Sequence, residues 1–215
     1  MIPKIIHHVW PGSDPFKQKF HNFRVSWMTL HPDWTFCFWR LDNLPDNINS
    51  DVLKILHDNR YTVTVKSDIL RYEILRLFGG IYTDTDMECL KPLDELCNLD
   101  FFTGYEDTIA CPSLIGCVPN HLAIQDTLNS ALHNLAHQLP GDINYQPNVF
   151  TGPVMFTNVL NKHKESVTIF DRSYFYPIHY TERHRLHENC NSAYTKHHWS
   201  GMDADGWVNN KHKTL

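Results

Sequence analysis

The chain has 215 residues and a formal net charge of −5, and 42% of its residues are hydrophobic. This length and apolar content predict one globular domain with a substantial core, and they exclude a disordered chain or two full domains. The sequence contains no basic run and no basic–aromatic tract, so nucleic acid is not expected as a partner.

The N-terminal segment and the cysteines indicate the compartment. Residues 1–10, MIPKIIHHVW, lack the apolar core of roughly 7–15 residues that a signal peptide requires. No stretch approaches the ~20 apolar residues of a membrane span. The six cysteines form no C-x-x-C pair and no zinc-finger spacing. We therefore expect a cytoplasmic protein with reduced thiols and no integral membrane segment.

The first part of the chain predicts alternating strands and helices. Apolar spacing predicts strands over residues 4–10 and 34–39 and helices over 16–30 and 52–56. A further helix is predicted to begin with Ser67 as its N-cap and to carry Asp68 in its first turn. Gly79-Gly80 ends that helix, because glycine adopts the left-handed conformation of a helix C-terminus. A short strand, 81–83, then leads directly into Asp84.

The second part continues the alternation and ends in a polar tail. Strands are predicted over 101–105 and 113–117, a helix over 121–137, and another helix from Pro153. Residues 173–215 are polar and poorly periodic, and they predict a loop-rich lid segment with little core of its own. The whole pattern predicts an α/β domain with a mostly parallel sheet. In such sheets ligands bind beyond the carboxyl ends of strands, where Trp10 and Asp84 fall.

Two aspartates at the end of the strand 81–83 carry the main chemical signal. Residues two apart in an extended segment point the same way, so Asp84 and Asp86 can face one site. Carboxylate oxygens select magnesium, manganese or calcium, and such a cation can hold a diphosphate. The alternative is a surface turn with two solvated carboxylates.

The preceding helix supplies a second pair of charged residues. Asp68 and Arg71 are three apart and share a helix face, which the Gly-Gly turn can aim at the same site. Arg71 suits a phosphate and Asp68 a sugar hydroxyl. The alternative is an exposed ion pair, which contributes about 0.5 kcal/mol or less to the free energy of unfolding.

The sequence resembles the DXD-containing sugar transferases of glycosyltransferase family 32. That family includes fungal initiating mannosyltransferases, and the glucosylating domains of large clostridial toxins are more distant relatives. The segments that carry the resemblance are IIHHVWPG (5–12), SDILRY (67–72) and FGGIYTDTD (78–86). A looser similarity extends to Thr151-Gly152-Pro153 and to the segment 197–201, so that it spans most of the chain.

The resemblance implies a GT-A-type fold for a single domain spanning residues 1–215. It also implies transfer of a sugar from a nucleotide diphosphate, with retention of anomeric configuration and with Mn²⁺ or Mg²⁺ as cofactor. Trp10 would lie at the nucleotide base, and Asp68 and Arg71 would hold the donor sugar. Tyr82 and Asp84 would contact the ribose or the sugar, while Asp86 would bind the metal. For Trp10 and Tyr82, packing in the core is the alternative.

The C-terminal segment 196–201, KHHWSG, resembles the closing segment of the family, which completes the metal site. By this resemblance His197 or His198 would bind the metal beside Asp84 and Asp86, together with Ser200. A solvated histidine pair is the alternative. The pair His7-His8 is expected to be structural or on the surface.

The expected function is therefore a metal-dependent retaining glycosyltransferase whose catalytic residues are Asp68, Arg71, Asp84 and Asp86. A UDP-sugar is favoured over GDP-mannose as the donor, and the acceptor is a hydroxyl of an unknown glycan, lipid or protein. Two alternatives stay open. One is a metal-dependent nucleotide-sugar hydrolase or phosphohydrolase, and the other is a catalytically idle nucleotide-sugar-binding module.

Overall fold

A six-stranded sheet forms the centre of the protein in the computed structural model, which describes residues 1–12, 18–137, 146–200, 202–203 and 206–207. The strand order is β2-β1-β3-β6-β5-β7, and β6 runs against the other five strands. The strands are β1 (Ile5–Val9), β2 (Thr35–Trp39), β3 (Gly80–Thr83), β5 (Phe101–Glu106), β6 (Ile109–Cys117) and β7 (Thr168–Phe170). The predicted α/β class with a mostly parallel sheet is confirmed.

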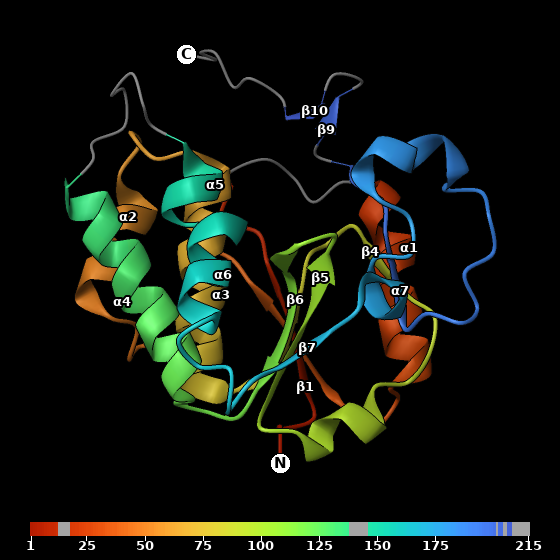
Figure 1. Ribbon diagram of the computed structural model, residues 1–215. Coiled ribbons are helices and arrows are strands. Elements are labelled where there is room, and N and C mark those ends of the chain that lie inside the picture. Colours follow the sequence, from red (N-terminus) through yellow and green to blue (C-terminus); the bar gives the residue numbers. More distant parts are fainter. Residues whose placement is uncertain (13–17, 138–145, 201, 204–205, 208–215) are drawn as a thin grey trace.

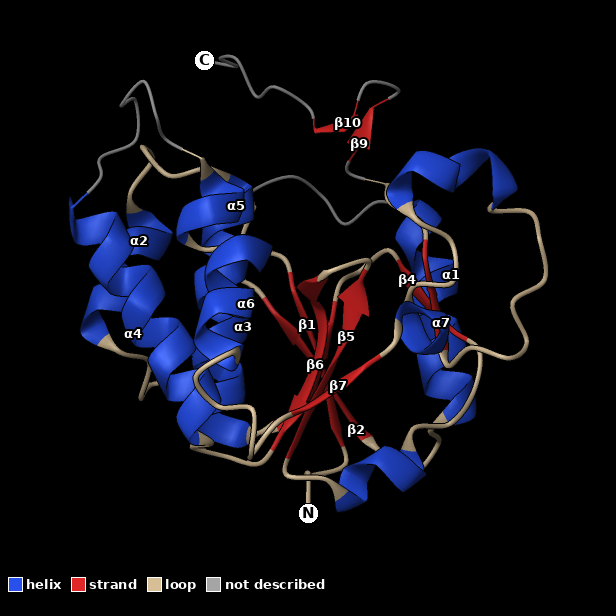
Figure 2. Ribbon diagram, viewed as in Figure 1, coloured by secondary structure: helices blue, strands red, loops and turns tan. Residues whose placement is uncertain are grey.

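Helices cover both faces of this sheet (Figures 1 and 2). One face carries α2 (Ser50–His57), α3 (Val63–Phe78), α4 (Leu122–His137), α5 (Pro147–Phe150) and α6 (Pro153–Leu160). The other carries α1 (Gln18–Leu30), α7 (Arg172–Phe175) and a small antiparallel sheet of β4 (Met87–Cys89) and β8 (Thr195–His197). Shorter elements are the 3-10 helices η1 (Asp94–Asn98) and η2 (Tyr180–Arg185), and a pair formed by β9 (Met202–Asp203) and β10 (Gly206–Trp207).

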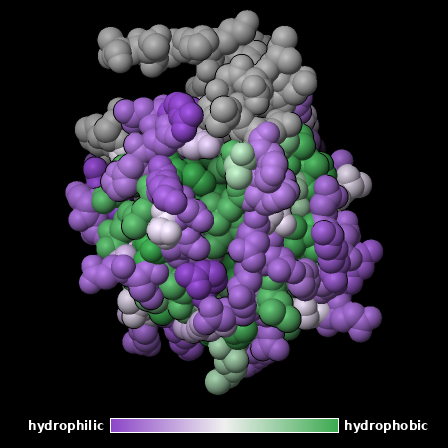
Figure 3. All heavy atoms as spheres, turned by 90° about the vertical axis from the view of Figure 1, so that its left-hand side faces the viewer, coloured by the Kyte–Doolittle hydropathy of each residue, from purple (hydrophilic) through white to green (hydrophobic). Residues whose placement is uncertain are grey.

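Each face of the sheet has its own apolar cluster. The first lies under α2, α3, α4 and α6, and the second lies under α1, α7 and the β4–β8 pair. On the outside of the first layer, hydrophilic side chains surround apolar patches (Figure 3). The first residues of α3 and α4, Val63 and Leu122, are exposed. No helix in the described part of the chain combines the length and apolarity needed to cross a bilayer. All six cysteines are free thiols.

The two histidines of β1 are structural, as expected. His7 and His8 are buried on opposite faces of the strand. The His7 ring accepts at Nδ1 from the Trp39 indole (3.0 Å) and so donates at Nε2 to the Gly79 carbonyl (2.9 Å). His8 Nδ1 lies 3.1 Å from the Thr83 carbonyl oxygen. Burial lowers the pKa of each ring to about 4, so both are neutral at pH 7.

Helix α3 begins earlier than the sequence predicted. Its N-cap is Thr62, whose hydroxyl accepts from the Val65 N–H, so the assignment of Ser67 as the N-cap was wrong. The β-branched residues 63–65 have low helix propensity and concealed the first turn. As a consequence, Asp68 lies in the second turn of a helix that is buried along most of its length.

The turn at Gly79-Gly80 has no room for a side chain. Both glycines have positive φ, 59° and 85°. A Cβ on Gly79 would lie 2.6 Å from Pro119, and one on Gly80 would lie 2.7 Å from the Ile5 carbonyl oxygen. The predicted helix stop is confirmed. The turn carries the chain from α3 straight into β3, and it fixes the face of α3 relative to the end of the strand.

The segment 173–200 contributes more to the core than the sequence suggested. Phe175, Tyr176 and Trp199 are buried in the second apolar cluster, so the expectation that this segment has little core of its own was wrong. Its aromatic residues follow no helical or strand period, because they pack from turns and short elements. Strand β8 also pairs with β4, with His197 opposite Met87. Its role as a lid stays a prediction.

Candidate active site

The D-x-D segment lies between β3 and β4 at the carboxyl edge of the sheet. An irregularity in the β5–β6 ladder, between Thr103 and Gly104, bends the facing part of β6. Thr103 stabilises this bend by donating its hydroxyl to the Cys111 and Leu114 carbonyls, at 3.1 and 2.7 Å. The neighbouring Ser113 carbonyl then accepts from the Asp84 N–H at 2.9 Å. Strand β6 therefore fixes the backbone of the first aspartate.

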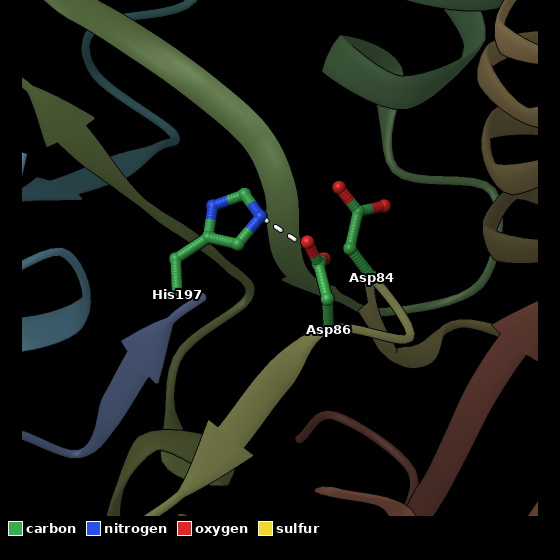
Figure 4. A group of neighbouring side chains, drawn as sticks. All are labelled: Asp84, Asp86 and His197. Atoms are coloured by element: carbon green, nitrogen blue, oxygen red, sulfur yellow. Dashed lines mark hydrogen bonds and ion pairs between the residues drawn. The ribbon is translucent and has the colours of Figure 1, made fainter. Parts of the chain in front are cut away.

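Asp84, Asp86 and His197 come together at this edge (Figure 4). Each offers one ligand atom, and these atoms lie within 4.8 Å of one another. Two carboxylates and one imidazole suit a divalent cation such as Mn²⁺. The solvated surface turn is therefore excluded, since the side chains of Asp86 and His197 are only 13% and 6% exposed.

The C-terminal segment holds Asp86 from several sides. His197 Nε2 lies 3.1 Å from Asp86 Oδ1, and the Ser200 N–H donates to Oδ2 at 2.7 Å. The His198 N–H donates to the Asp86 carbonyl at 3.0 Å. Burial alone would raise the pKa of the Asp86 carboxyl. The charge of His197 and these hydrogen bonds outweigh burial and hold that pKa below its usual value.

A left-handed residue shapes this segment. Trp199 has φ 50°, an uncommon conformation for a bulky side chain. Its indole donates to the Ile178 carbonyl at 3.0 Å, and its ring lies 3.8 Å from that of His197. The reversal at Trp199 lets the N–H groups on either side of it both reach Asp86. Packing of the indole thus supports a strained backbone beside Asp84, Asp86 and His197.

The charged pair on α3 is buried and reaches the same edge. Arg71 Nη2 lies 2.9 Å from Asp68 Oδ1, and Nη1 lies 3.4 Å from Asp84 Oδ1. Nη1 also donates to the Pro112 carbonyl at 2.9 Å. The side chains of Asp68 and Arg71 are each 6% exposed, so the alternative of an exposed ion pair is wrong. One guanidinium joins α3, β3 and β6.

Two further residues that the sequence reasoning missed fix Asp68. The Thr151 hydroxyl donates to Asp68 Oδ2 at 2.7 Å, and the Tyr72 hydroxyl donates to the Thr151 carbonyl at 2.8 Å. Burial raises the pKa of Asp68 to about 6, although the charge of Arg71 and the Thr151 hydrogen bond oppose that shift. From the sequence, Thr151 enters only through the looser family similarity. Its distance from Asp68 in the sequence hid its role.

The two aromatic residues predicted at the donor differ in exposure. Tyr82 is buried, its hydroxyl donates to Asp84 Oδ1, and its ring lies 4.7 Å from the Arg71 guanidinium carbon. The structure thus shows Tyr82 as a support for Asp84. Trp10 follows β1 at the same edge, is partly exposed and lies 5.7 Å from the Phe20 ring. Their contacts with a nucleotide stay predictions.

Of the two histidines predicted in the C-terminal segment, His197 faces the aspartates and His198 does not. His198 Nε2 pairs with Glu88 Oε2 at 2.9 Å, and its ring stacks on Phe23. Adjacent residues of an extended segment point in opposite directions, so the side chains of His197 and His198 cannot both face the Asp86 carboxylate. The structure places the His198 side chain on Glu88, and metal binding by His198 stays a prediction. Ser200 contributes its backbone N–H, while metal binding by its hydroxyl stays a prediction.

Comparison with known proteins finds similarity to glycosyltransferases. Residues 18–102 match the family described as "glycosyltransferase sugar-binding region containing DXD motif". A relative covering most of the chain is an uncharacterized glycosyltransferase of Acanthamoeba polyphaga mimivirus, 26% identical over 92% of this chain and 82% of that protein. Inositol phosphoceramide mannosyltransferase 3 of Schizosaccharomyces pombe is 34% identical over 44% of this chain and 27% of that protein.

A solved structure supports the same fold. The glycosyltransferase PaToxG superposes with a TM-score of 0.58 and 21% identity, over 75% of this chain and 69% of that one. Its likeness, with the sheet described above, confirms the predicted GT-A-type fold. The D-x-D segment 84–86 falls inside the matched region 18–102. The chain therefore contains a segment that matches the glycosyltransferase sugar-binding region with the DXD motif, as the resemblance predicted.

Proposed function

We propose that this site, most of whose residues fall in the region 18–102 that matches the DXD-containing sugar-binding region of glycosyltransferases, transfers a sugar from a nucleotide diphosphate to an acceptor hydroxyl. Asp84, Asp86 and His197 would hold a divalent cation there. The observation that carries the proposal is the convergence of these three groups with Asp68 and Arg71 at one edge of the sheet.

The charge balance of the site supports metal dependence. Three carboxylates, Asp68, Asp84 and Asp86, face a single guanidinium, Arg71. A nucleotide diphosphate would meet a net negative site unless a cation were present. A bound cation would act as a Lewis acid on the leaving diphosphate. The imidazole of His197 favours Mn²⁺ over Mg²⁺, because Mg²⁺ prefers oxygen ligands throughout.

The buried carboxylate Asp68 supports transfer with retention through same-face attack. Both of its oxygens already have partners, Arg71 and Thr151, so Asp68 is placed to orient a sugar hydroxyl and not to form a covalent bond. The acceptor oxygen would bond to the anomeric carbon from the face that the diphosphate leaves. The acceptor proton would pass to the leaving diphosphate. Arg71 would stabilise the charge that develops there. Isolation of a covalent sugar–Asp68 adduct would contradict this mechanism.

Nucleotide release tests the proposal directly. The protein is incubated with UDP-sugars and GDP-mannose, in Mn²⁺, Mg²⁺ or a chelator, with and without sugar acceptors. A UDP-sugar is our first expectation, and the similarity to a mannosyltransferase makes GDP-mannose the necessary comparison. We expect metal-dependent release that acceptors accelerate. Release that no acceptor accelerates would indicate the hydrolase alternative, and tight binding without release would indicate the idle binding module.

A further inference from the structure

A further carboxylate, that of Glu106, lies at the same edge of the sheet as the D-x-D segment. Strand β5 runs parallel to β3, with β6 between them, and Glu106 is its last residue. Side chains alternate along a strand, so Glu106 shares its face with Gly104. Gly104 packs against Phe175 and Tyr176 of the C-terminal segment. Glu106 therefore lies on the face that this segment covers, on the side of the site opposite Asp68.

The Glu106 carboxylate is largely buried, but its hydrogen-bonding capacity is not fully used. Its side chain is 17% exposed, and Oε1 is buried with no hydrogen-bond partner in the described part of the chain. His179 Nε2 lies 3.4 Å from Oε1, which is too long for a good hydrogen bond. Burial raises the pKa of Glu106, and the charges of His179 and His197 and a hydrogen bond from the Tyr180 backbone N–H oppose that shift. An enclosed carboxylate with this capacity left is suited to accept a hydrogen bond from a ligand.

His179 is fixed so that it faces Glu106. Its Nδ1 lies 3.3 Å from the Thr181 backbone nitrogen and 2.7 Å from the Thr181 hydroxyl oxygen, and Nε2 faces Glu106. Glu182 accepts from the His179 N–H at 3.2 Å and completes a capping box at the start of η2. Arg172 and Arg185 in turn hold Glu182, at 2.8 and 2.7 Å. This network orients the imidazole and, through it, the carboxylate.

The face of the sheet that carries Glu106 continues to the proposed cation site. Tyr176 packs against Gly104 on this face, and the centroid of its ring lies 6.2 Å from that of His197. The Tyr176 hydroxyl donates to the Cys111 carbonyl at 3.1 Å. None of the donor-side contacts described above uses Glu106. The carboxylate is thus near the cation site, on the side left for the second substrate.

We propose that Glu106 binds the acceptor substrate, its carboxylate accepting a hydrogen bond from a hydroxyl of a polyol, either a sugar or a cyclitol. This inference rests on the proposed function. A carboxylate forms a stronger hydrogen bond with a hydroxyl than a neutral group does. A substrate that lacks this hydroxyl would leave the largely buried carboxylate unpaired and would therefore bind more weakly. Glu106 binds a hydroxyl that does not react, and His179 is a positioning residue for it. The reacting hydroxyl still passes its proton to the leaving diphosphate.

The test compares two reactions of each variant with the donor that the wild type cleaves in Mn²⁺. The first is hydrolysis without acceptor. The second is transfer to methyl α-mannopyranoside, methyl β-galactopyranoside and myo-inositol as probes. For Glu106→Gln we expect hydrolysis within about threefold of wild type and a drop of about tenfold or more in kcat/KM for the polyol, mainly through KM. Glu95→Gln, on the exposed helix η1, is the matched control.

His179 variants separate positioning from general support of the fold. His179→Ala should raise KM for the polyol, and His179→Gln, whose amide N–H can replace Nε2–H, should restore part of the loss. Equal losses in hydrolysis and transfer for Glu106→Gln would overturn the inference. The inference would also be overturned if the wild type hydrolysed the donor, transferred the sugar to none of the three polyols and showed no change in hydrolysis when they were present. A wild type that cleaves no donor would refute the proposed function itself.

Discussion

The two halves of the site are built in different ways. The donor half, with Asp68, Arg71 and Asp84, comes from one continuous helix–turn–strand unit. In it Asp68 and Arg71 are buried, and Arg71 pairs with both aspartates. The tail half reaches Asp86 from more than a hundred residues away, through a short ladder and a few hydrogen bonds. The first half is held by local geometry, and the second depends on the docking of a distant segment. We expect the donor half to be rigid and the tail half to respond to ligands.

The largest effect is expected where the two halves meet. Asp86→Asn keeps the shape of the side chain but removes the charge that a cation and His197 both require. Turnover should fall by about 1,000-fold or more, since about 4 kcal/mol of charge stabilisation is removed from the transition state. The measurement is kcat for nucleotide release at saturating Mn²⁺, with circular dichroism to show that the variant is folded. Metal-dependent turnover within tenfold of wild type would rule out Asp86 as a metal ligand.

Breaking the donor half should cost stability as well as activity. Arg71→Met leaves Asp68 and Asp84 without their shared guanidinium in a buried site, and such losses amount to about 3–5 kcal/mol of unfolding free energy. Urea unfolding measures the change. The control is Arg60→Met, which removes an exposed pair with Asp58 and should leave the unfolding free energy unchanged. Equal effects of the two substitutions would show that the donor half is not preorganised by its ion pairs.

Acid should lower the free energy of unfolding through His7 and His8 of β1, which pack under the donor half. His7 and His8 bind the carbonyls at the two ends of the α3–β3 turn and strand, Gly79 and Thr83. Their folded pKa values of about 4 lie below the unfolded value of 6.5, so the unfolded chain binds more protons between these limits. Stability should therefore fall as pH drops from about 6.5 to 4, by on the order of 3 kcal/mol per histidine.

Urea unfolding at several pH values measures this slope. His8→Gln removes one of the two titrating rings, so its unfolding free energy should change less with pH than that of the wild type. The same slope in both proteins would show that the His8 ring does not titrate as described.

The smallest effect is expected at the support of Asp84. Tyr82→Phe removes the hydroxyl bonded to Asp84 but leaves the contact between Asp84 and Arg71. A hydrogen bond to a charged group contributes about 1.5 kcal/mol or more, so kcat/KM for the donor should fall by about tenfold. Steady-state kinetics with varied donor gives this value. A fall as large as that of Asp86→Asn would mean that Tyr82 contacts the substrate directly, as the family resemblance implies.

The same contrast explains what the sequence could predict. The donor half was predictable because Asp68, Arg71, Gly79-Gly80 and the D-x-D segment are linked by helix and strand periods over a short stretch. The start of α3 was not, because β-branched residues follow Thr62. The β6 irregularity, the Thr151 hydroxyl and the choice of His197 over His198 depend on contacts between distant segments. Local patterns do not carry that information.

A Mn²⁺ titration tests the central claim most directly. Isothermal calorimetry with UDP present compares the wild type, His197→Ala and His198→Ala. We expect His197→Ala to bind Mn²⁺ at least about tenfold more weakly, the loss that even outer partners of metal ligands produce. His198→Ala, whose lost ring pairs with Glu88, should bind Mn²⁺ like the wild type. Unchanged affinity in His197→Ala, or a loss confined to His198→Ala, would contradict a cation site formed by Asp84, Asp86 and His197.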